Sequence, residues 1–378
     1  MLTAASIAFG ILFLHYGYFL FTVYKGLNRL TRFPEKAESK KYFVSVIVPF
    51  RNEENEILNS LKSIENQNYD ENFFEVIYVD DSSTDNSLKI LRGNINRKNI
   101  KVIEHNDNSQ SRAHKKKVIE HAIEKSQGEI IVTTDADCTH GNDWLTSMVN
   151  CFDEETGFVS GPVEFLPGES FFEKLQALEF AGLIITGAGL IGAGRPAICN
   201  AANLAFRKSA FYDVGGYSGN LNLSSGDDEF LMQKIHADTN YKVKFCADKR
   251  AKVFTKPAPD LTGFYQQRKR WASKGLFYKN KKLVISLILI FLFYFGLFLF
   301  PLFAMLMNGK FWLLFAAGFV LKIVTEFIVM NKGIKILYNT KMLKYFPAAE
   351  IFHIPYIVIA SLSGLKGNFE WKGRELSR

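Results

Sequence analysis

Cysteine is scarce in this 378-residue chain, and its placement excludes two kinds of site. The four cysteines, Cys138, Cys151, Cys199 and Cys246, are scattered and form no CxxC pair. This spacing argues against a structural zinc site and against a disulfide framework, and it fits a reducing compartment. The chain also contains no internal repeat and no low-complexity tract.

Charge is absent from two long stretches. Residues 1–24 and 283–307 contain no Asp, Glu, Lys or Arg. Each is long enough to cross a hydrocarbon core of ~30 Å, which requires about 20 apolar residues in a helix. We therefore expect an N-terminal transmembrane anchor at 1–24 and a second transmembrane helix at 283–307. A third is expected at 311–330, and a transmembrane or interfacial helix at 347–365; residues 42–281 have the composition of a water-soluble domain.

The first apolar stretch also lacks the basic start and small-residue cleavage site of a secretory signal peptide, so we expect it to be retained. Lys25, Arg29 and Arg32 follow it and predict that this end faces the cytosol. The chain has a formal net charge of +8, but its basic residues gather beside the apolar stretches. They fit anionic lipid headgroups better than nucleic acid. We expect a protein integral to the cytoplasmic membrane, with residues 42–281 in the cytosol and no nucleic-acid partner.

Two further features of the apolar regions call for an interpretation. Lys322 and Glu326 lie four residues apart within the third apolar stretch, a spacing that predicts a self-neutralising pair on one helix face near its cytosolic end. The aromatic and aliphatic residues between Phe171 and Phe180 recur at helical spacing and precede a run of small residues, 187–194. Core packing and an interfacial helix that holds the acceptor site against the bilayer both explain this segment.

Strand-like and helix-like patterns alternate through the first half of the soluble region. Such alternation is typical of βαβ units around a parallel sheet, so the predicted fold class is α/β. The predicted strands are 44–50, 74–79, 101–104 and 129–134, and helical patterns occur near 57–64, 84–92 and 118–123.

Acidic residues follow three of these strands at the point where each strand ends. Glu53 follows the first strand, Asp80 and Asp81 the second, and Asp135 and Asp137 the fourth. Ligands bind at the carboxyl ends of strands in open α/β sheets. Carboxylates that converge there repel one another unless a cation offsets them, and hard oxygen ligands suit Mg²⁺ or Mn²⁺. Solvated turn residues are the alternative explanation of these motifs.

Six segments, in this order, resemble those of inverting glycosyltransferase family 2, whose fold is called GT-A. They are VSVIVPFRNEE, VIYVDDSSTDNS, HKKKVIEHAI, IIVTTDADC, the SGDDE motif at 225–229 and the QxxRW signature at 267–271. The segment 194–211 is similar to the acceptor side of that family. One departure is the missing glycine before the lysine of the third segment; Lys115 aligns with the family lysine, and Lys116 is the alternative. The resemblance implies a Rossmann-like, mostly parallel sheet beside the transmembrane helices.

The resemblance also implies a role for each matching residue. Asp228 is expected to be the general base with Asp227 beside it, because this chain has Asp where the family often has Glu. Asp137 is expected to bind the metal, and Asp135 the metal or the ribose of the donor. The expected donor site further comprises Pro49, Arg51, Glu53, Asp80, Asp81, Lys115, Gln267 and Arg270, and the expected acceptor site comprises Asn200 and Trp271.

The resulting hypothesis is a membrane-bound transferase that takes a sugar from a nucleotide-diphosphate donor, by family habit a UDP-sugar. Its acceptor is expected to be a membrane lipid or a lipid-linked glycan, and its cofactor Mg²⁺ or Mn²⁺. A processive polysaccharide synthase, an inactive nucleotide-binding scaffold of the cell envelope, and a transporter are the alternatives. A homo-oligomer or an envelope partner is left open. The basic residues around Trp271 also fit a juxtamembrane belt instead of a site.

Overall fold

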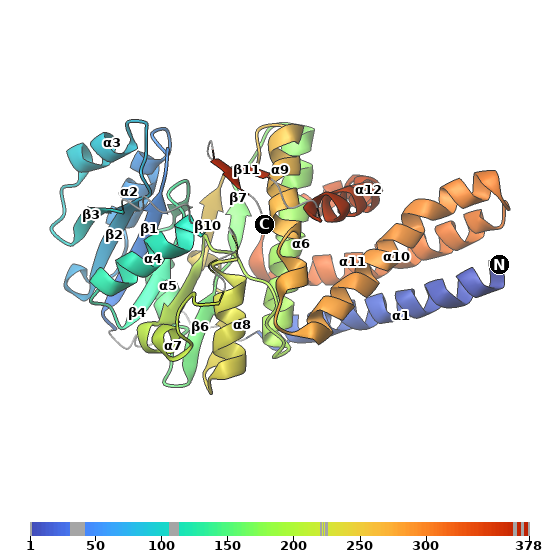
Figure 1. Cartoon of the computed structure of the whole chain (residues 1–378), viewed down its shortest axis with the longest axis horizontal. Helices are drawn as coiled ribbons and strands as arrows, with labels where there is room; N and C mark the ends of the chain where they lie inside the picture. The colour runs from blue at the N-terminus through green and yellow to red at the C-terminus, as the bar shows by residue number, and fades with distance from the viewer. Residues whose placement is uncertain are drawn as a thin grey trace.

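The computed structural model describes residues 2–30, 42–105, 113–219, 221, 223 and 226–365, and the backbone of 369–371 and 374–376. Its architecture has two parts. An α/β domain forms one end of an elongated molecule, and long helices extend from it toward the N-terminus at the other end (Figure 1).

A seven-stranded sheet forms the centre of the α/β domain. The strand order is β3-β2-β1-β4-β8-β6-β9, with β8 antiparallel to both of its neighbours and every other pair parallel. The strands are β1 (Val44–Phe50), β2 (Phe74–Asp80), β3 (Ile100–Glu104), β4 (Ile130–Thr133), β6 (Thr156–Ser160), β8 (Leu204–Arg207) and β9 (Lys242–Phe245). The four predicted strands and the mostly parallel sheet are confirmed. The antiparallel β8 has no local signature in the sequence.

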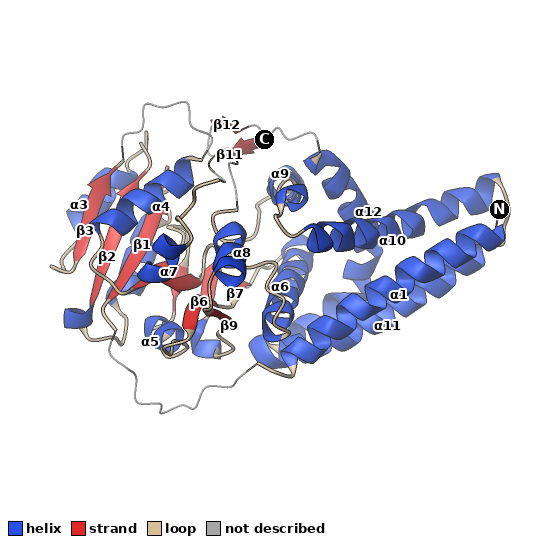
Figure 2. Cartoon of the chain, turned by 60° about the horizontal axis from the view of Figure 1, so that its bottom comes forward, coloured by secondary structure: helices blue, strands red, loops and turns tan. Residues whose placement is uncertain are grey.

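Short helices cover the faces of this sheet (Figure 2). They are α2 (Ile57–Glu65), α3 (Ser87–Asn94), α4 (His114–Lys125), α5 (Trp144–Val149), α7 (Lys208–Asp213) and α8 (Glu229–Asp238). Val118, Ile119, Ala122 and Ile123 are the buried apolar face of α4, as their helical spacing predicts. A second sheet has the order β5-β10-β7, built from β5 (Thr139–His140), β10 (Val253–Thr255) and β7 (Val163–Phe165). β11 (Phe369–Trp371) and β12 (Arg374–Leu376) form an antiparallel hairpin.

Five helical segments of the described residues are long and apolar enough to cross a membrane. Four of them carry the predicted apolar stretches: α1 (Leu2–Leu27), α10 (Lys281–Leu306), α11 (Phe311–Leu337), and Thr340–Gly364, which contains α12 (Phe346–Gly364). The fifth is α6 (Phe171–Gly192). In α6 the apolar window is 61% buried, against 17–28% in the other four, because α6 lies between the α/β domain and the long helices (Figure 1).

Helices α1 and α6 cross at a contact made by glycines. A Cβ atom on Gly26 of α1 would lie 1.7 Å from the carbonyl oxygen of Gly189 in α6, so only glycine permits this approach. A Cβ on Gly189 would likewise lie 2.5 Å from Val23. Phe180 is buried, as the core-packing explanation of the 171–180 pattern predicts, and the interfacial explanation stays a prediction.

A cluster of charged and hydroxyl groups is buried among the long helices. Lys322 of α11 is fully buried and pairs with Glu326 at 3.0 Å, as the spacing predicts, but it also pairs with Glu350 of α12. The prediction of a self-contained pair near one end of the helix is therefore wrong. Lys322 is the twelfth of 27 residues in α11, close to the middle, and its second partner comes from another helix.

Candidate active site

One cavity of about 1250 Å³ lies between the carboxyl ends of the central strands and the helices α6, α9 (Leu261–Ala272), α10 and α12. It brings together nearly all of the residues that the sequence predicts for the site. Those that line it are Pro49, Arg51, Glu53, Asp81, Lys115, Asp135, Asp137, Asn200, Asp227, Asp228, Gln267, Arg270 and Trp271.

Asp80 is the exception, because it does not line the cavity. Asp80 is buried, and its Oδ1 accepts hydrogen bonds from the backbone N–H of Ser83 at 3.0 Å and from the Ser83 hydroxyl at 2.5 Å. Neighbouring residues in an extended strand point to opposite sides. Of the two adjacent aspartates, Asp81 therefore lines the cavity and Asp80 holds the turn after β2.

The residues predicted around the nucleobase are held by two adjoining turns. Asn52 and Ser82 have positive φ angles of 52° and 55°, an uncommon conformation that brings the ends of β1 and β2 together. Arg51 donates to the carbonyl oxygens of Asp81 at 2.7 Å and Ser82 at 2.5 Å. The backbone N–H of Glu53 donates to the hydroxyl of Ser87 at 2.7 Å. These hydrogen bonds join the two turns at this end of the cavity.

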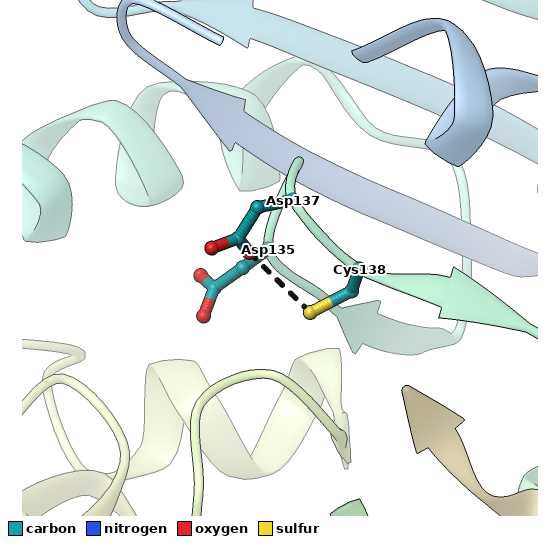
Figure 3. Close-up of side chains that lie close together, drawn as sticks. All are labelled: Asp135, Asp137 and Cys138. Atoms are coloured by element: carbon teal, nitrogen blue, oxygen red, sulfur yellow. Dashed lines mark hydrogen bonds between the residues drawn. The ribbon is translucent and has the colours of Figure 1, made fainter. Parts of the chain in front are cut away.

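Asp135 and Asp137 follow β4, and their carboxylates lie side by side near the thiol of Cys138 (Figure 3). The Cys138 Sγ donates to Asp137 at 3.5 Å. Burial, reinforced by Asp137, raises the pKa of this thiol well above its ordinary value, so it stays protonated and is no ligand for a hard cation. The two carboxylates therefore supply an all-oxygen donor set of the kind that suits Mg²⁺ or Mn²⁺.

Lys115 is the second residue of α4 and lies between two of the predicted acidic residues. Its Nζ is 2.6 Å from Asp135 and 3.4 Å from Asp227. Burial lowers the pKa of Lys115, but Asp135 and Asp227 outweigh it and raise the pKa above its ordinary value, so the ammonium is retained. Lys116 does not line the cavity; it donates to the carbonyl of Leu223 at 2.9 Å. The position facing the cavity supports Lys115 over Lys116 as the counterpart of the family lysine.

Asp227 and Asp228 precede α8 and lie in different surroundings. Burial raises the pKa of Asp227, but Lys115 and Lys116 outweigh it, so its pKa lies below the ordinary value. Asp228 caps the N-terminus of α8 and accepts from the N–H of Glu229 at 2.8 Å. Both aspartates line the cavity, so the choice between them rests on the motif alignment.

Lys274 and Glu229 are cavity residues that the sequence reasoning missed. The ammonium of Lys274 lies 3.1 Å from Glu229 and 3.6 Å from Asp228. Burial is the main cause that raises the pKa of Glu229 to about 7. Lys274 lies four residues after Arg270, about one helical turn, and this spacing could have indicated that the two side chains face the same site. The basic residues around Lys274 instead favoured its interpretation as part of a juxtamembrane belt.

The signature residues of α9 divide into two groups. The guanidinium of Arg270 lies near four acidic residues of the cavity, Asp227 foremost, yet its side chain makes no direct hydrogen bond or ion pair within the described part of the chain. Arg268 is buried, forms an ion pair with Glu179 of α6, and lies over the ring of Trp271 at 4.2 Å. It also donates to Gln267. Arg270 is therefore available to an anionic ligand, whereas Arg268 holds the other signature side chains.

Similarity to known proteins agrees with this geometry. Residues 45–215 match the family model described as glycosyl transferase family 2. The chain carries a family 2 glycosyltransferase domain. Glycosyltransferase AglE of Haloferax volcanii is 28% identical over 211 residues, which cover 54% of this chain and 65% of the relative. Beta-monoglucosyldiacylglycerol synthase of Nostoc sp. is 29% identical over 241 residues, which cover 62% of this chain and 49% of the relative.

The fold of the family 2 domain is also found in a solved structure. Mannosyltransferase PcManGT from Pyrobaculum calidifontis, in complex with GDP-Man and Mn²⁺, aligns with a TM-score of 0.58 at 19% identity. The alignment covers 97% of this chain and 99% of that one. The likeness therefore extends beyond the α/β domain to the long helices, and the predicted GT-A fold with apolar helices at both ends is confirmed. The chain matches less than two thirds of the length of the curated relatives named above.

Proposed function

We propose that this protein transfers a sugar, with inversion, from a nucleotide-diphosphate donor to a hydroxyl group of a lipid or lipid-linked glycan. One observation carries the proposal. A single cavity is lined at one end by the acidic strand ends and the signature helix α9, and at the other end by the apolar helices α6, α10 and α12. A donor and a membrane-held acceptor are thus served by one site.

The donor end has the charges that a nucleotide diphosphate requires. Lys115 and Arg270 are cations in the cavity, and Arg favours bidentate contact with phosphate oxygens. Asp135 and Asp137 fit a divalent cation, which when bound neutralises charge on the departing diphosphate. The base is predicted to be uridine from the family resemblance, and the PcManGT structure with GDP-Man makes guanosine the second candidate.

We assign the acceptor step to Asp228, which lines the cavity and aligns with the general base of the family motif. The acceptor oxygen attacks the anomeric carbon, the bond from that carbon to the diphosphate oxygen breaks, and Asp228 takes the hydroxyl proton. At the N-terminus of α8 the Asp228 carboxylate accepts from the N–H of Glu229 at 2.8 Å and lies 3.6 Å from the ammonium of Lys274, so both contacts hold it at the cavity wall. A hydroxyl acceptor needs such a base, whereas a phosphate acceptor is already ionised. The base position therefore supports a hydroxyl acceptor.

The long helices bear on the processive alternative. Phe9, Phe293 and Phe300 of α1 and α10 are buried against one another, with ring centroids 5.3 and 4.7 Å apart. Aromatic side chains therefore fill the space between these two helices. The Nostoc relative is named for a glycolipid product, which further supports single transfer to a lipid. We place the catalytic domain in the cytosol at the membrane surface, because Lys25 lies in the last turn of α1 and Arg29 follows the helix.

The test is nucleotide-diphosphate release by the full chain in nanodiscs that contain native membrane lipids. UDP- and GDP-sugars are supplied with Mn²⁺, Mg²⁺ or a chelator. We expect release from one donor only, dependent on the cation, with Asp137→Asn and Asp228→Asn each lowering the rate by about 10²- to 10⁴-fold. Asp213→Asn is the matched control, because Asp213 is exposed at the end of α7 and outside the cavity.

Each outcome of this test has a meaning. Product mass separates addition of one sugar from polymer formation. Release that persists with the chelator would exclude the proposed cation. Donor binding without release from any donor or lipid would refute the transferase proposal in favour of a nucleotide-binding scaffold.

A further inference from the structure

At the end of the cavity away from the acidic strand ends, the lining is apolar and takes no part in the proposed transfer chemistry. It is formed by apolar side chains of three helices: Leu183 of α6, Leu287, Ile288 and Phe291 of α10, and Ile357 and Ala360 of α12. Of these, Leu183 and Ile288 are 37% and 42% exposed, so the lining reaches the surface of the apolar helices. We call this set of six residues the apolar groove.

Two cations at the boundary between the groove and the catalytic end, Arg268 and Lys274, are already paired, and Arg270 is assigned to the donor diphosphate. Arg268 is held by Glu179, which also accepts from the hydroxyl of Tyr356 at 2.7 Å. Lys274 is held by Glu229 and Asp228. A phosphate at this boundary would have to displace one of these carboxylates, whereas an uncharged hydroxyl would not. The boundary therefore fits an uncharged headgroup.

We propose that the apolar groove binds the hydrocarbon tail of an acceptor lipid whose headgroup is uncharged, such as a diacylglycerol or a neutral glycolipid. The assignment rests on the proposed transferase function, and it adds the chemical class of the acceptor and the place of its tail. The argument is continuity: the groove and Asp228 line the same cavity, so a tail held by α10 and α12 brings its headgroup hydroxyl to the base.

The groove binds a tail by close packing and not by the hydrophobic effect. A lipid tail that leaves the bilayer for the groove exchanges one apolar environment for another, so its affinity comes from van der Waals contact with the side chains of the groove. Held in the groove, the hydroxyl is also fixed in direction and distance relative to the donor. Blocking the groove is therefore expected to impair use of a long-chain acceptor without affecting donor binding, which occurs at the strand ends.

The experiment uses a dioleoylglycerol with a photoactivatable diazirine in one tail, with the full chain in phosphatidylcholine nanodiscs. Labelled peptides are located by mass spectrometry. The variants form two pairs. Within each pair the same substitution is made on the same helix, once inside the groove and once outside it. Ile288→Trp and Ile357→Trp fill it, whereas Ile285→Trp and Ile359→Trp alter exposed positions of α10 and α12 outside the cavity. UDP and GDP binding to each variant shows that the catalytic domain is folded.

We expect labels on α10 and α12 in the wild type, reduced at least tenfold by each groove variant and less than twofold by its control. Unlabelled dioleoylglycerol should compete, and dioleoyl phosphatidic acid should not. Equal labelling of all four variants would overturn the groove assignment, and equal competition by phosphatidic acid would overturn the uncharged headgroup. Because labelling requires binding and not turnover, failure here is distinguishable from failure of the transferase proposal, which the release assay measures.

Discussion

Replacing Lys322 by methionine should destabilise the protein strongly, although the residue is far from the predicted catalytic groups. Lys322 is fully buried, and its Nζ lies 3.0 Å from Glu326 and pairs with Glu350. Glu326 also accepts from the hydroxyls of Tyr16 at 2.6 Å and Tyr294 at 2.9 Å. These five residues come from α1, α10, α11 and α12, so the cluster joins four helices.

The magnitude follows from the two carboxylates that the substitution leaves behind. Breaking a buried ion pair by removing one partner costs about 3–5 kcal/mol, since the remaining charge stays buried without compensation. At about 2.1 cal/mol/K per residue, the unfolding entropy of a chain of 378 residues is about 0.8 kcal/mol/K. The melting midpoint should therefore fall by about 5 °C. Heat-induced unfolding in detergent, followed by intrinsic fluorescence, measures this shift.

The double variant Lys322→Met/Glu350→Leu is the decisive comparison. It restores the net charge of the cluster and leaves Glu326 with its two tyrosine hydroxyls, so most of the lost stability should return. Lys332→Met is a control on the same helix, because Lys332 is only partly buried and forms no ion pair with the described residues. The reasoning is refuted if the single variant melts like the wild type, or if the double variant melts no higher than the single one.

Three further predictions concern the boundary between the domain and the helices. The pKa of Glu229 is about 7 in the folded chain, against an ordinary value of 4.5, so its protonation stabilises the fold at low pH and this contribution is lost as pH rises through about 7. Glu229→Gln should therefore reduce the change in unfolding free energy between pH 5 and 8 by up to about 3 kcal/mol. Denaturant unfolding at several pH values measures this change. Gly189→Leu should lower the yield of folded protein by size-exclusion chromatography, since even a Cβ there would lie 2.5 Å from Val23, whereas Gly10→Leu, with open space around it, should not. Arg268→Met should raise the KM for acceptor more than it lowers donor affinity, because Trp271 loses the group that holds its ring; an equal effect on donor binding would contradict the role given to Arg268.

Local patterns in the sequence predict some parts of this fold well. The run of β-branched residues at Val44–Phe50 is buried almost throughout, and a continuous apolar run of that length identifies a strand of a parallel sheet. The ordered motifs likewise predict which residues meet in the cavity, because strand ends converge at one edge of such a sheet.

Other features depend on partners that are distant in the sequence. The pairing of Lys322 with Glu350 joins residues of two helices, and the spacing within one helix gives no information about the other. The inward position of Lys274 and Arg268 depends in the same way on Glu229 and Glu179. Basic residues next to an apolar stretch therefore have the same local signature whether they face lipid headgroups or the acidic residues of a site.

The contact between Gly26 and Gly189 affects the distance between the membrane anchor and the cavity. The backbones of the two helices touch at these glycines, so α6, which lines the cavity, is packed directly against the anchor α1. Under the proposed function, this packing sets how far the acceptor hydroxyl must extend from the bilayer to reach Asp228. We therefore expect the contact between α1 and α6 to select acceptors by the length of their headgroups, with longer and shorter headgroups used less well.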